Sequence, residues 1–207
     1  MKRTKIILII LCVTFVVSGC QNGGANNINN IMKEKVTFAD PAFEVMVRNS
    51  IGKLGGDITI EDLSYIKYIS ADMSDTNFSY SSNPESEDIL SVSTRWDLRT
   101  IEDLKYFVNL EALQISDFDV SNIDFIKSMT NLKYLEISGI TPTLNALSST
   151  PNIKVLIING LSVGNDDYSI LAKLKKLQRL GISPKAYNEL PNKVIKALEK
   201  NDVEIIK

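Results

Sequence analysis

Apolar residues recur in four similar units along the second half of the chain. Each unit places an apolar residue at nearly every third position and ends on an apolar-x-apolar pair, as Leu113 and Ile115 do. This change of spacing predicts a turn or short helix that leads into one short strand. The corresponding leucines Leu113, Leu135, Leu156 and Leu180 are 22, 21 and 24 residues apart. A unit of this size cannot bury its own apolar edge, so we expect the units to stack with these leucines side by side.

The residues before the repeats predict a helical cap. The sequence Phe38-Ala39-Asp40-Pro41 places an acceptor side chain before a proline, and apolar residues at helical spacing follow until Gly55 and Gly56. Thr59 and Asp62 then have the spacing of a capping box, which predicts a second short helical turn. Such a cap shields the apolar end of the first repeat from water.

The residues after the repeats predict a second cap. Pro191 can begin a helix in which Val194, Ile195 and Leu198 share one face, and residues 203–206 predict a last strand. Together, these patterns predict an α/β fold. It is a short repeat solenoid with a parallel sheet, an N-terminal helical cap and a C-terminal helix-strand cap.

Residues 38–71 resemble the helical cap of internalin-like leucine-rich repeat proteins of bacteria. The matching pattern is an aromatic-x-Asp start, an Arg-bearing helix, a Gly-x-Ile-Thr turn and an acidic-Leu step, carried by Phe38, Asp40, Arg48, Gly56, Ile58, Thr59, Asp62 and Leu63. The repeats fit as well: residues 109–115 and 131–137 read Asn-Leu-x-x-Leu-x-Ile, and residues 152–158 read Asn-Ile-x-x-Leu-x-Ile. The resemblance covers most of residues 36–207 and implies binding of proteins or surface glycans through the exposed face of the strands.

The repeats depart from the family pattern at one position. Where such families usually carry an inward Asn that bonds to neighbouring turns, this chain has Phe118, Ile140 and Leu161. Larger apolar groups there predict a more apolar and less regular turn. We therefore do not infer the curvature of this solenoid from that of the family.

An additional segment, residues 73–97, separates the first predicted strand from the next repeat. Insertions in a stacked array are expelled to its rim, so we expect an exposed loop. A second hypothesis makes the segment a ligand-contacting finger anchored by Phe78, Tyr80 and Trp96, because aromatic side chains dominate binding hot spots. Residues 89–92 also have the composition of a short strand within it.

The first twenty residues have the parts of a secretory signal: a basic start, an apolar stretch over residues 6–17 and small residues before Cys20. Twelve helical residues span about 18 Å, which is short of the hydrocarbon core at about 30 Å. Val17-Ser18-Gly19-Cys20 resembles the lipobox of bacterial lipoproteins, which implies lipid on Cys20 and removal of the residues before it. The alternative is an ordinary signal that ends in Cys.

We therefore expect three parts of the chain. Residues 1–19 are a lipoprotein signal peptide, residues 20–33 are the lipidated Cys and a flexible Gly- and Asn-rich tether, and residues 34–207 are the capped repeat domain. Within the domain we expect the following parts: the N-terminal cap and first strand (34–72), the inserted loop (73–97), the repeats (98–186) and the C-terminal cap (187–207). The expected location is the bacterial cell membrane, with the protein held by lipid on its extracytoplasmic face.

The composition argues against catalysis and against a metal or cofactor site. The chain has no His, and removal of residues 1–19 leaves Cys20 as the one thiol, which would carry lipid. No glycine-rich stretch is followed by the Lys-Ser/Thr pair that a phosphate-binding loop requires. Asp117, Asp119 and Asp124 lack the spacing of a calcium-binding loop. The mature chain has 20 basic against 25 acidic residues, a formal charge of −5, which argues against nucleic acid as a partner. We expect no enzymatic activity, no cofactor and no metal.

Alternation of side chains along each strand predicts which residues face outward on the exposed side of the sheet. The candidates for ligand contact are Tyr68, Gln114, Tyr134, Glu136, Ile157 and Arg179. The alternative is that they are solvated strand residues that pack on one another. The sequence favours noncovalent recognition by a membrane-anchored lipoprotein, with adhesion as one use. An envelope immunity or sequestering lipoprotein against a toxic peptide, and a structural subunit of an envelope assembly, remain alternatives.

Overall fold

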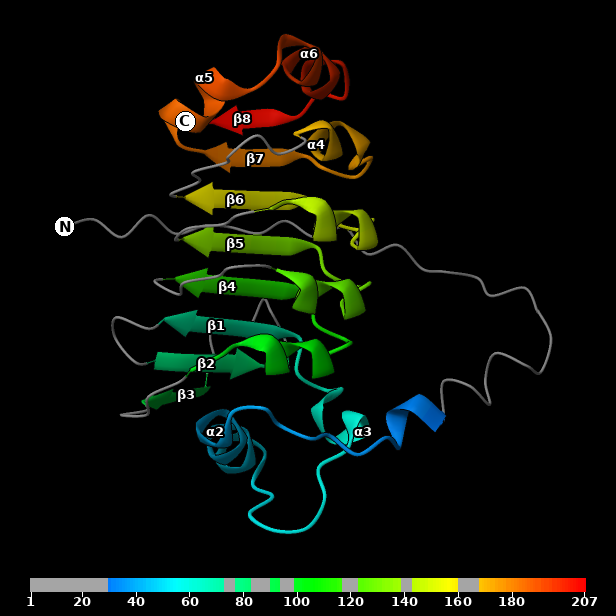
Figure 1. Ribbon diagram of the computed structural model, residues 1–207, viewed down its shortest axis with the longest axis vertical. Helices are drawn as coiled ribbons and strands as arrows, with labels where there is room; N and C mark the ends of the chain where they lie inside the picture. The colour runs from blue at the N-terminus through cyan, green and yellow to red at the C-terminus, as the bar shows by residue number, and fades with distance from the viewer. Residues whose placement is uncertain are drawn as a thin grey trace.

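The computed structural model describes residues 30–72, 77–82, 90–93, 99–116, 123–138, 143–159 and 168–207. These residues form an eight-stranded sheet in the order β3-β2-β1-β4-β5-β6-β7-β8, with short helices along one face and a helical layer at each end (Figure 1). The strands are β1 (Tyr68–Asp72), β2 (Asn77–Ser81), β3 (Leu90–Ser93), β4 (Ala112–Ser116), β5 (Tyr134–Ser138), β6 (Val155–Asn159), β7 (Arg179–Ile182) and β8 (Glu204–Ile206). The predicted signal peptide, Cys20 and most of the predicted tether lie outside the described residues.

Each repeat consists of one helical turn followed by one parallel strand, as the spacing of apolar residues predicts. The turns are the 3₁₀ helices η1 (Glu102–Tyr106), η2 (Asp124–Ser128) and η3 (Asn145–Ser149) and the helix α4 (Ser169–Lys173). The caps contain α2 (Pro41–Ile51), α3 (Ile60–Leu63), α5 (Pro184–Glu189) and α6 (Asn192–Lys200). In the part of the chain that is described, no helix is long and apolar enough to cross a bilayer.

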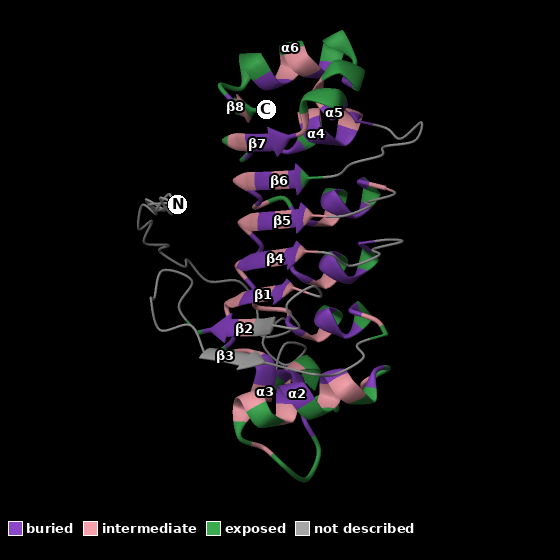
Figure 2. Ribbon diagram, turned by 90° about the vertical axis from the view of Figure 1, so that its left-hand side faces the viewer, coloured by how far each residue is buried: buried purple, intermediate pink, exposed green. Residues whose placement is uncertain are grey.

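The four leucines that define the repeat lie side by side. Leu113 pairs in register with Leu135, Leu135 with Leu156, and Leu156 with Leu180, and none of them is exposed to solvent. Buried residues alternate with partly exposed ones along β1 and β5 (Figure 2). The buried ones pack in one core with apolar residues of the helical turns. The predicted fold class, a short α/β repeat solenoid with a parallel sheet, is therefore confirmed.

A polar ladder holds the turns that precede the strands. The Asn109 amide donates to the Ser64 carbonyl oxygen at 3.2 Å, and the Asn131 amide donates to Asn109 Oδ1 at 3.5 Å. Further along, the Asn152 amide donates to the Thr130 carbonyl oxygen at 2.8 Å. The repeats thus have an asparagine ladder at the first position of the Asn-Leu-x-x-Leu motif. Phe118, Ile140 and Leu161, at the position where the family pattern has its inward Asn, lie outside the described residues.

The predicted N-terminal cap helix begins as the sequence indicates. Asp40 caps α2 and accepts hydrogen bonds from the backbone N–H groups of Ala42 and Phe43 at 2.8 and 3.3 Å. The Thr59 and Asp62 capping box is present at α3. Because an N-cap side chain satisfies donors that have no partner within the helix, these two residues fix where the cap helices start.

Two buried carboxylates fasten this cap to the first repeat. Asp103, on η1, is fully buried and accepts hydrogen bonds from the backbone N–H groups of Ala39 and Asp40, all at 2.9 Å. In return, Asp40, 2% exposed, accepts from the backbone N–H groups of Arg99 and Thr100 at 2.6 and 3.2 Å. Burial raises the pKa of Asp40, but its hydrogen bonds from backbone N–H groups outweigh burial and hold that pKa below the usual value. We call Asp40 and Asp103 the carboxylate clasp.

The inserted segment is not wholly an exposed loop: that prediction is wrong for residues 77–81, which form β2, whereas the short strand expected over residues 89–92 corresponds to β3. β2 pairs antiparallel with β1, and β3 pairs antiparallel with β2. The physical reason is that the outer edge of β1 would otherwise leave its backbone N–H and C=O groups unpaired. Tyr80 is 5% exposed and donates its hydroxyl to the Ser50 carbonyl oxygen at 2.6 Å, so it is a core residue and not a ligand anchor.

The C-terminal cap contains the predicted helix and strand and one additional helix. Val194 and Leu198 of α6 are buried, and β8 pairs parallel with β7. The helix α5 was not predicted. Ser183 caps it by accepting from the backbone N–H of Ala186 at 3.2 Å, and Pro184 occupies its first turn. Ser183 therefore follows the end of β7 and is not part of the exposed face of that strand.

Candidate functional site

The exposed face of the parallel strands includes two rows of neighbouring side chains that cross all six of these strands, and a third row, Asp72, Ser116, Ser138 and Asn159, that crosses four of them. The first row contains Tyr68, Ala112, Tyr134, Val155, Arg179 and Glu204, and the second contains Ser70, Gln114, Glu136, Ile157, Gly181 and Ile206. We call these twelve residues the strand face. All six predicted contact residues lie within it, because the register of the stack places equivalent positions of each repeat next to one another. That they contact a ligand stays a prediction.

Two tyrosines cover the residue between them. Tyr68 and Tyr134 lie on either side of Ala112 in the first row, and Ala112 is only 6% exposed although it is on the open face. Burial is the main cause of a raised pKa for Tyr68; a hydrogen bond with Ser70 lowers that pKa, and the negative charge of Glu136 raises it by less. Because Glu136 follows Tyr134 by two residues on β5, the two tyrosines and Glu136 are neighbours on the strand face.

Glu136 is bonded to one of these tyrosines. The Tyr134 hydroxyl donates a short hydrogen bond to Glu136 Oε2. Burial is the main cause of a strongly raised pKa for Tyr134, and the bond to the Glu136 carboxylate raises that pKa further. The phenol therefore stays protonated and keeps donating to the carboxylate through the physiological range. We call Tyr68, Tyr134 and Glu136 the Tyr–Glu cluster.

The second row has its own contacts on either side of Glu136. The Ser70 hydroxyl donates to Gln114 Oε1 at 3.5 Å. A Cβ atom added at Gly181 would lie 3.2 Å from two side-chain carbons of Ile157, so the glycine leaves room for Ile157 to lie against β7. Gln114 and Ile157 are thus held partly by their neighbours, and Glu136 is the charged residue between them.

Arg179 has a partner that the sequence analysis did not identify. Its Nε atom lies 2.8 Å from Glu204 Oε2, in an ion pair whose two side chains are 42% and 58% exposed. Glu204 belongs to β8, which adds a sixth strand to the parallel part of the face. The predicted last strand was the one signal that could have identified this partner. Because that strand pairs in register with β7, it places Glu204 beside Arg179.

Charged residues also lie at the two ends of the strands. Lys67, Lys133 and Lys154 immediately precede β1, β5 and β6, and the backbone bonds between strands begin at these residues. Lys133 forms a 2.5 Å ion pair with Glu111 from the neighbouring repeat. At the other end of β1 lies Asp72. The face therefore has a basic edge where the strands begin.

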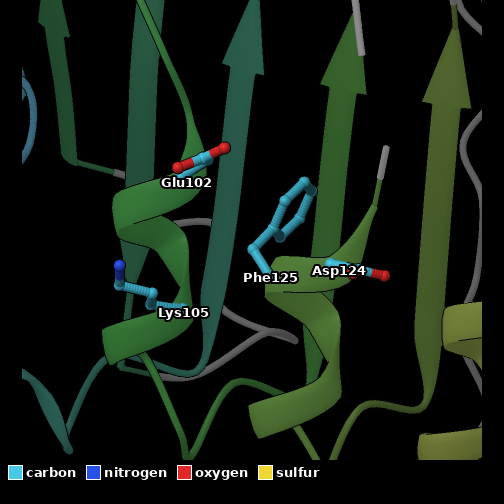
Figure 3. A pocket seen from close by; sticks show the side chains of 4 residues that line it. All are labelled: Glu102, Lys105, Asp124 and Phe125. Carbon is cyan, nitrogen blue, oxygen red and sulfur yellow. The ribbon is translucent and has the colours of Figure 1, made fainter. Parts of the chain in front are cut away.

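A shallow hollow of about 290 Å³ lies on the opposite side of the molecule, between η1 and η2, lined by Glu102, Lys105, Asp124 and Phe125 (Figure 3). Asp124 forms a 2.8 Å ion pair with Lys127, and Figure 3 shows its carboxylate directed away from Glu102. Within the described ranges, no three His, Cys, Asp or Glu residues are grouped as a metal site. Asp117 and Asp119 lie outside these ranges. The hollow brings no reactive set of side chains together.

The in-register stack of helical turns and parallel strands, closed by a cap at each end, defines a leucine-rich repeat solenoid. No family model matches the chain. The acidic leucine-rich nuclear phosphoprotein 32-related protein of Plasmodium falciparum (isolate 3D7) is 33% identical over 95 residues, which cover 43% of this chain and 34% of that protein. The chain thus spans about a third of the length of this curated relative.

Similar solved structures include two internalins of Listeria monocytogenes strain 4b F2365. Internalin inlF is 18% identical with a TM-score of 0.36, and the match covers 86% of this chain and 57% of that one. Internalin C2 (inlC2) is 21% identical with a TM-score of 0.35, and the match covers 87% of this chain and 89% of that one. The assignment of the fold to the leucine-rich repeat class rests on the register of this chain's own repeats.

Proposed function

We propose that this chain is a noncovalent binding module whose strand face contacts a protein or a surface glycan. The observation that carries the proposal is the Tyr–Glu cluster: two large aromatic side chains and a carboxylate lie on β1 and β5 in the middle of the sheet, and Tyr134 is bonded to Glu136. Aromatic side chains that are partly buried and held in place are typical anchors of binding interfaces. The repeat architecture supports this use, since it presents one extended face built from equivalent positions.

We further propose that the module works while anchored to a bacterial membrane. The support is the sequence of residues 1–20, in which a basic start, a short apolar stretch and Val17-Ser18-Gly19-Cys20 together resemble a lipoprotein signal. Lipid on Cys20 would hold the module on the extracytoplasmic face, where attachment to a host or neighbouring cell is possible. Cell fractionation tests this step: Cys20→Ser is expected to move the protein from the membrane to the soluble fraction, and unchanged membrane association would contradict it.

Site-specific photo-crosslinking in the full-length, membrane-associated protein tests the binding role. A photoreactive amino acid at Val155 lies in the first row of the strand face, beside Tyr134 and Arg179. The matched control carries it at Ser148, an exposed residue of η3 on the opposite side of the sheet. We expect a discrete crosslinked species from Val155 and none from Ser148, when cells or envelope fractions are irradiated. Identical patterns from the two positions, or no product from Val155, would contradict the proposal.

A further inference from the structure

We propose that the Tyr–Glu cluster binds the cationic side chain of a lysine or arginine that a protein partner presents to the strand face. This inference deepens the proposed function and rests on it. The cluster occupies the middle of the sheet, with Tyr68 on β1 and both Tyr134 and Glu136 on β5. β1 and β5 are separated by one strand, so the backbones that carry the tyrosines are about 10 Å apart.

The first argument is that the Glu136 carboxylate, on the strand face, has no cation of its own, whereas several other carboxylates of the described chain do. Glu44, Glu111 and Glu204 each lie within 2.8 Å of an Arg or Lys side chain. Among the described residues, no Lys or Arg nitrogen lies within 4.0 Å of the Glu136 carboxylate, and its Oε1 atom receives no hydrogen bond. A partly buried carboxylate with an open oxygen gains most from a cation brought by a ligand.

The second argument is the chemistry of the neighbouring rings. A tyrosine ring attracts a lysine ammonium or an arginine guanidinium placed over its face, and the attraction grows where water is excluded. Tyr68 and Tyr134 are both partly buried and lie on either side of Ala112. Two rings and a carboxylate offer a cation both a surface to stack on and a hydrogen-bond acceptor, a combination that suits Arg especially.

The third argument is the charge of the face around the cluster. The two rows contain two carboxylates, Glu136 and Glu204, and one guanidinium, that of Arg179. Arg179 is engaged with Glu204, so Glu136 is the carboxylate of these two rows without a cation. Lys133 at the start of the strands is paired with Glu111, but Lys67 and Lys154 repel a basic partner from that edge, which favours approach from the side of Asp72. A divalent metal is a poorer match, since it needs several oxygen ligands and the cluster has one carboxylate.

Titration of a labelled hexa-arginine peptide tests the proposal directly. The full-length protein is held in neutral phosphatidylcholine vesicles, so that the lipid adds no charge, and binding is followed by fluorescence anisotropy. We expect Glu136→Gln to weaken binding roughly tenfold, because it removes the charge and keeps the shape of the side chain. The matched control is Glu102→Gln, an exposed carboxylate on η1 at the opposite side of the sheet, which we expect to leave affinity unchanged. Equal losses from the two variants would show general attraction to an acidic protein and would overturn the proposal.

A second pair of variants tests the rings. Tyr68→Leu is expected to weaken hexa-arginine binding several-fold. Tyr65→Leu replaces a tyrosine outside the strand face that is 44% exposed, and is expected to have no effect. Thermal melting of each variant confirms that the fold is retained.

The outcomes separate this inference from the proposed function. If Val155 forms a crosslink but Glu136→Gln binds hexa-arginine as tightly as the unmodified chain does, the cation assignment fails and the binding role stands. If Val155 forms no crosslink, the binding role itself fails.

Discussion

Both ends of the stack are closed by apolar side chains, but the N-terminal end is also fastened by buried carboxylates. At the first end, the carboxylate clasp joins α2 to residues 99–103 through hydrogen bonds to backbone N–H groups. At the other end, Val194 and Leu198 of α6 are each 1% exposed and pack into the core, and the neighbouring ion pair of Arg179 and Glu204 is exposed. The two ends therefore respond to different changes.

The difference teaches how each end is specified. A hydrogen bond to a buried carboxylate depends on position and direction, so the clasp sets one arrangement of the cap on the first repeat. Apolar packing depends mainly on volume and shape, and tolerates exchange between residues of similar size. Further carboxyls with a lowered pKa also lie at the N-terminal end. A hydrogen bond from Lys35 lowers the pKa of Asp57, and a hydrogen bond from Lys53 lowers that of Asp62.

Removal of one clasp carboxylate breaks the N-terminal end. Asp103→Ala leaves the backbone N–H groups of Ala39 and Asp40 without their acceptor in a buried place. We expect a loss of about 4 kcal/mol in the free energy of unfolding, measured by urea denaturation. Glu61→Ala, at an exposed acid of the same cap, is the control and should change the free energy by less than about 0.5 kcal/mol. Equal effects of the two substitutions would show that the clasp contributes nothing.

Truncation of one apolar side chain breaks the C-terminal end. Leu198→Ala opens a cavity under α6, and we expect a loss of about 3 kcal/mol in the free energy of unfolding. Leu198→Met keeps most of the volume and is expected to cost less than about 1.5 kcal/mol. Urea denaturation of both variants measures the difference, and a larger loss from Met than from Ala would refute the role of packing volume.

Acid separates the two ends without any substitution. Because the pKa of Asp40 is lower in the folded chain than in the unfolded chain, folding favours the ionised carboxylate. This stabilisation is present above about pH 4 and is lost as the pH falls through the folded-state pKa. We expect hydrogen-exchange protection, corrected for intrinsic rates, to fall more in α2 than in α6 between pH 5 and pH 3.

The matched variant for the acid experiment is Asp40→Asn, which cannot ionise. It should lower protection of α2 already at pH 5 and remove most of the additional loss at pH 3. The same additional loss in this variant would assign the acid sensitivity to other carboxyls.

The repeat could be predicted from the sequence because its signal is periodic and local. The spacing of Leu113, Leu135, Leu156 and Leu180 is enough to predict their alignment, and Asp40 and Thr59 identify the starts of two helices through bonds within a few residues. The alternation of Phe78 and Tyr80 with serines was a strand signal within the insertion, but the rule that insertions in a stacked array are expelled to its rim favoured a loop.

The long-range contacts could not be predicted in the same way. The acceptor role of Asp103 depends on backbone N–H groups more than sixty residues away, and a sequence does not distinguish such a carboxylate from a solvated one. The same holds for the candidate site. Alternation places Tyr68, Tyr134 and Glu136 on one face, but the bond between Tyr134 and Glu136 depends on rotamers that the pattern does not specify.

The in-register stack also determines how such a chain can change its length. Each repeat pairs through its strand with the strands immediately before and after it, as β5 does with β4 and β6. Duplication of one unit of about 22 residues between β5 and β6 would therefore add about 4.8 Å and a fresh set of outward side chains, while both closing layers keep their present neighbours. The antiparallel β2 prevents such growth beyond β1, so this protein can be extended from within but not past its first repeat.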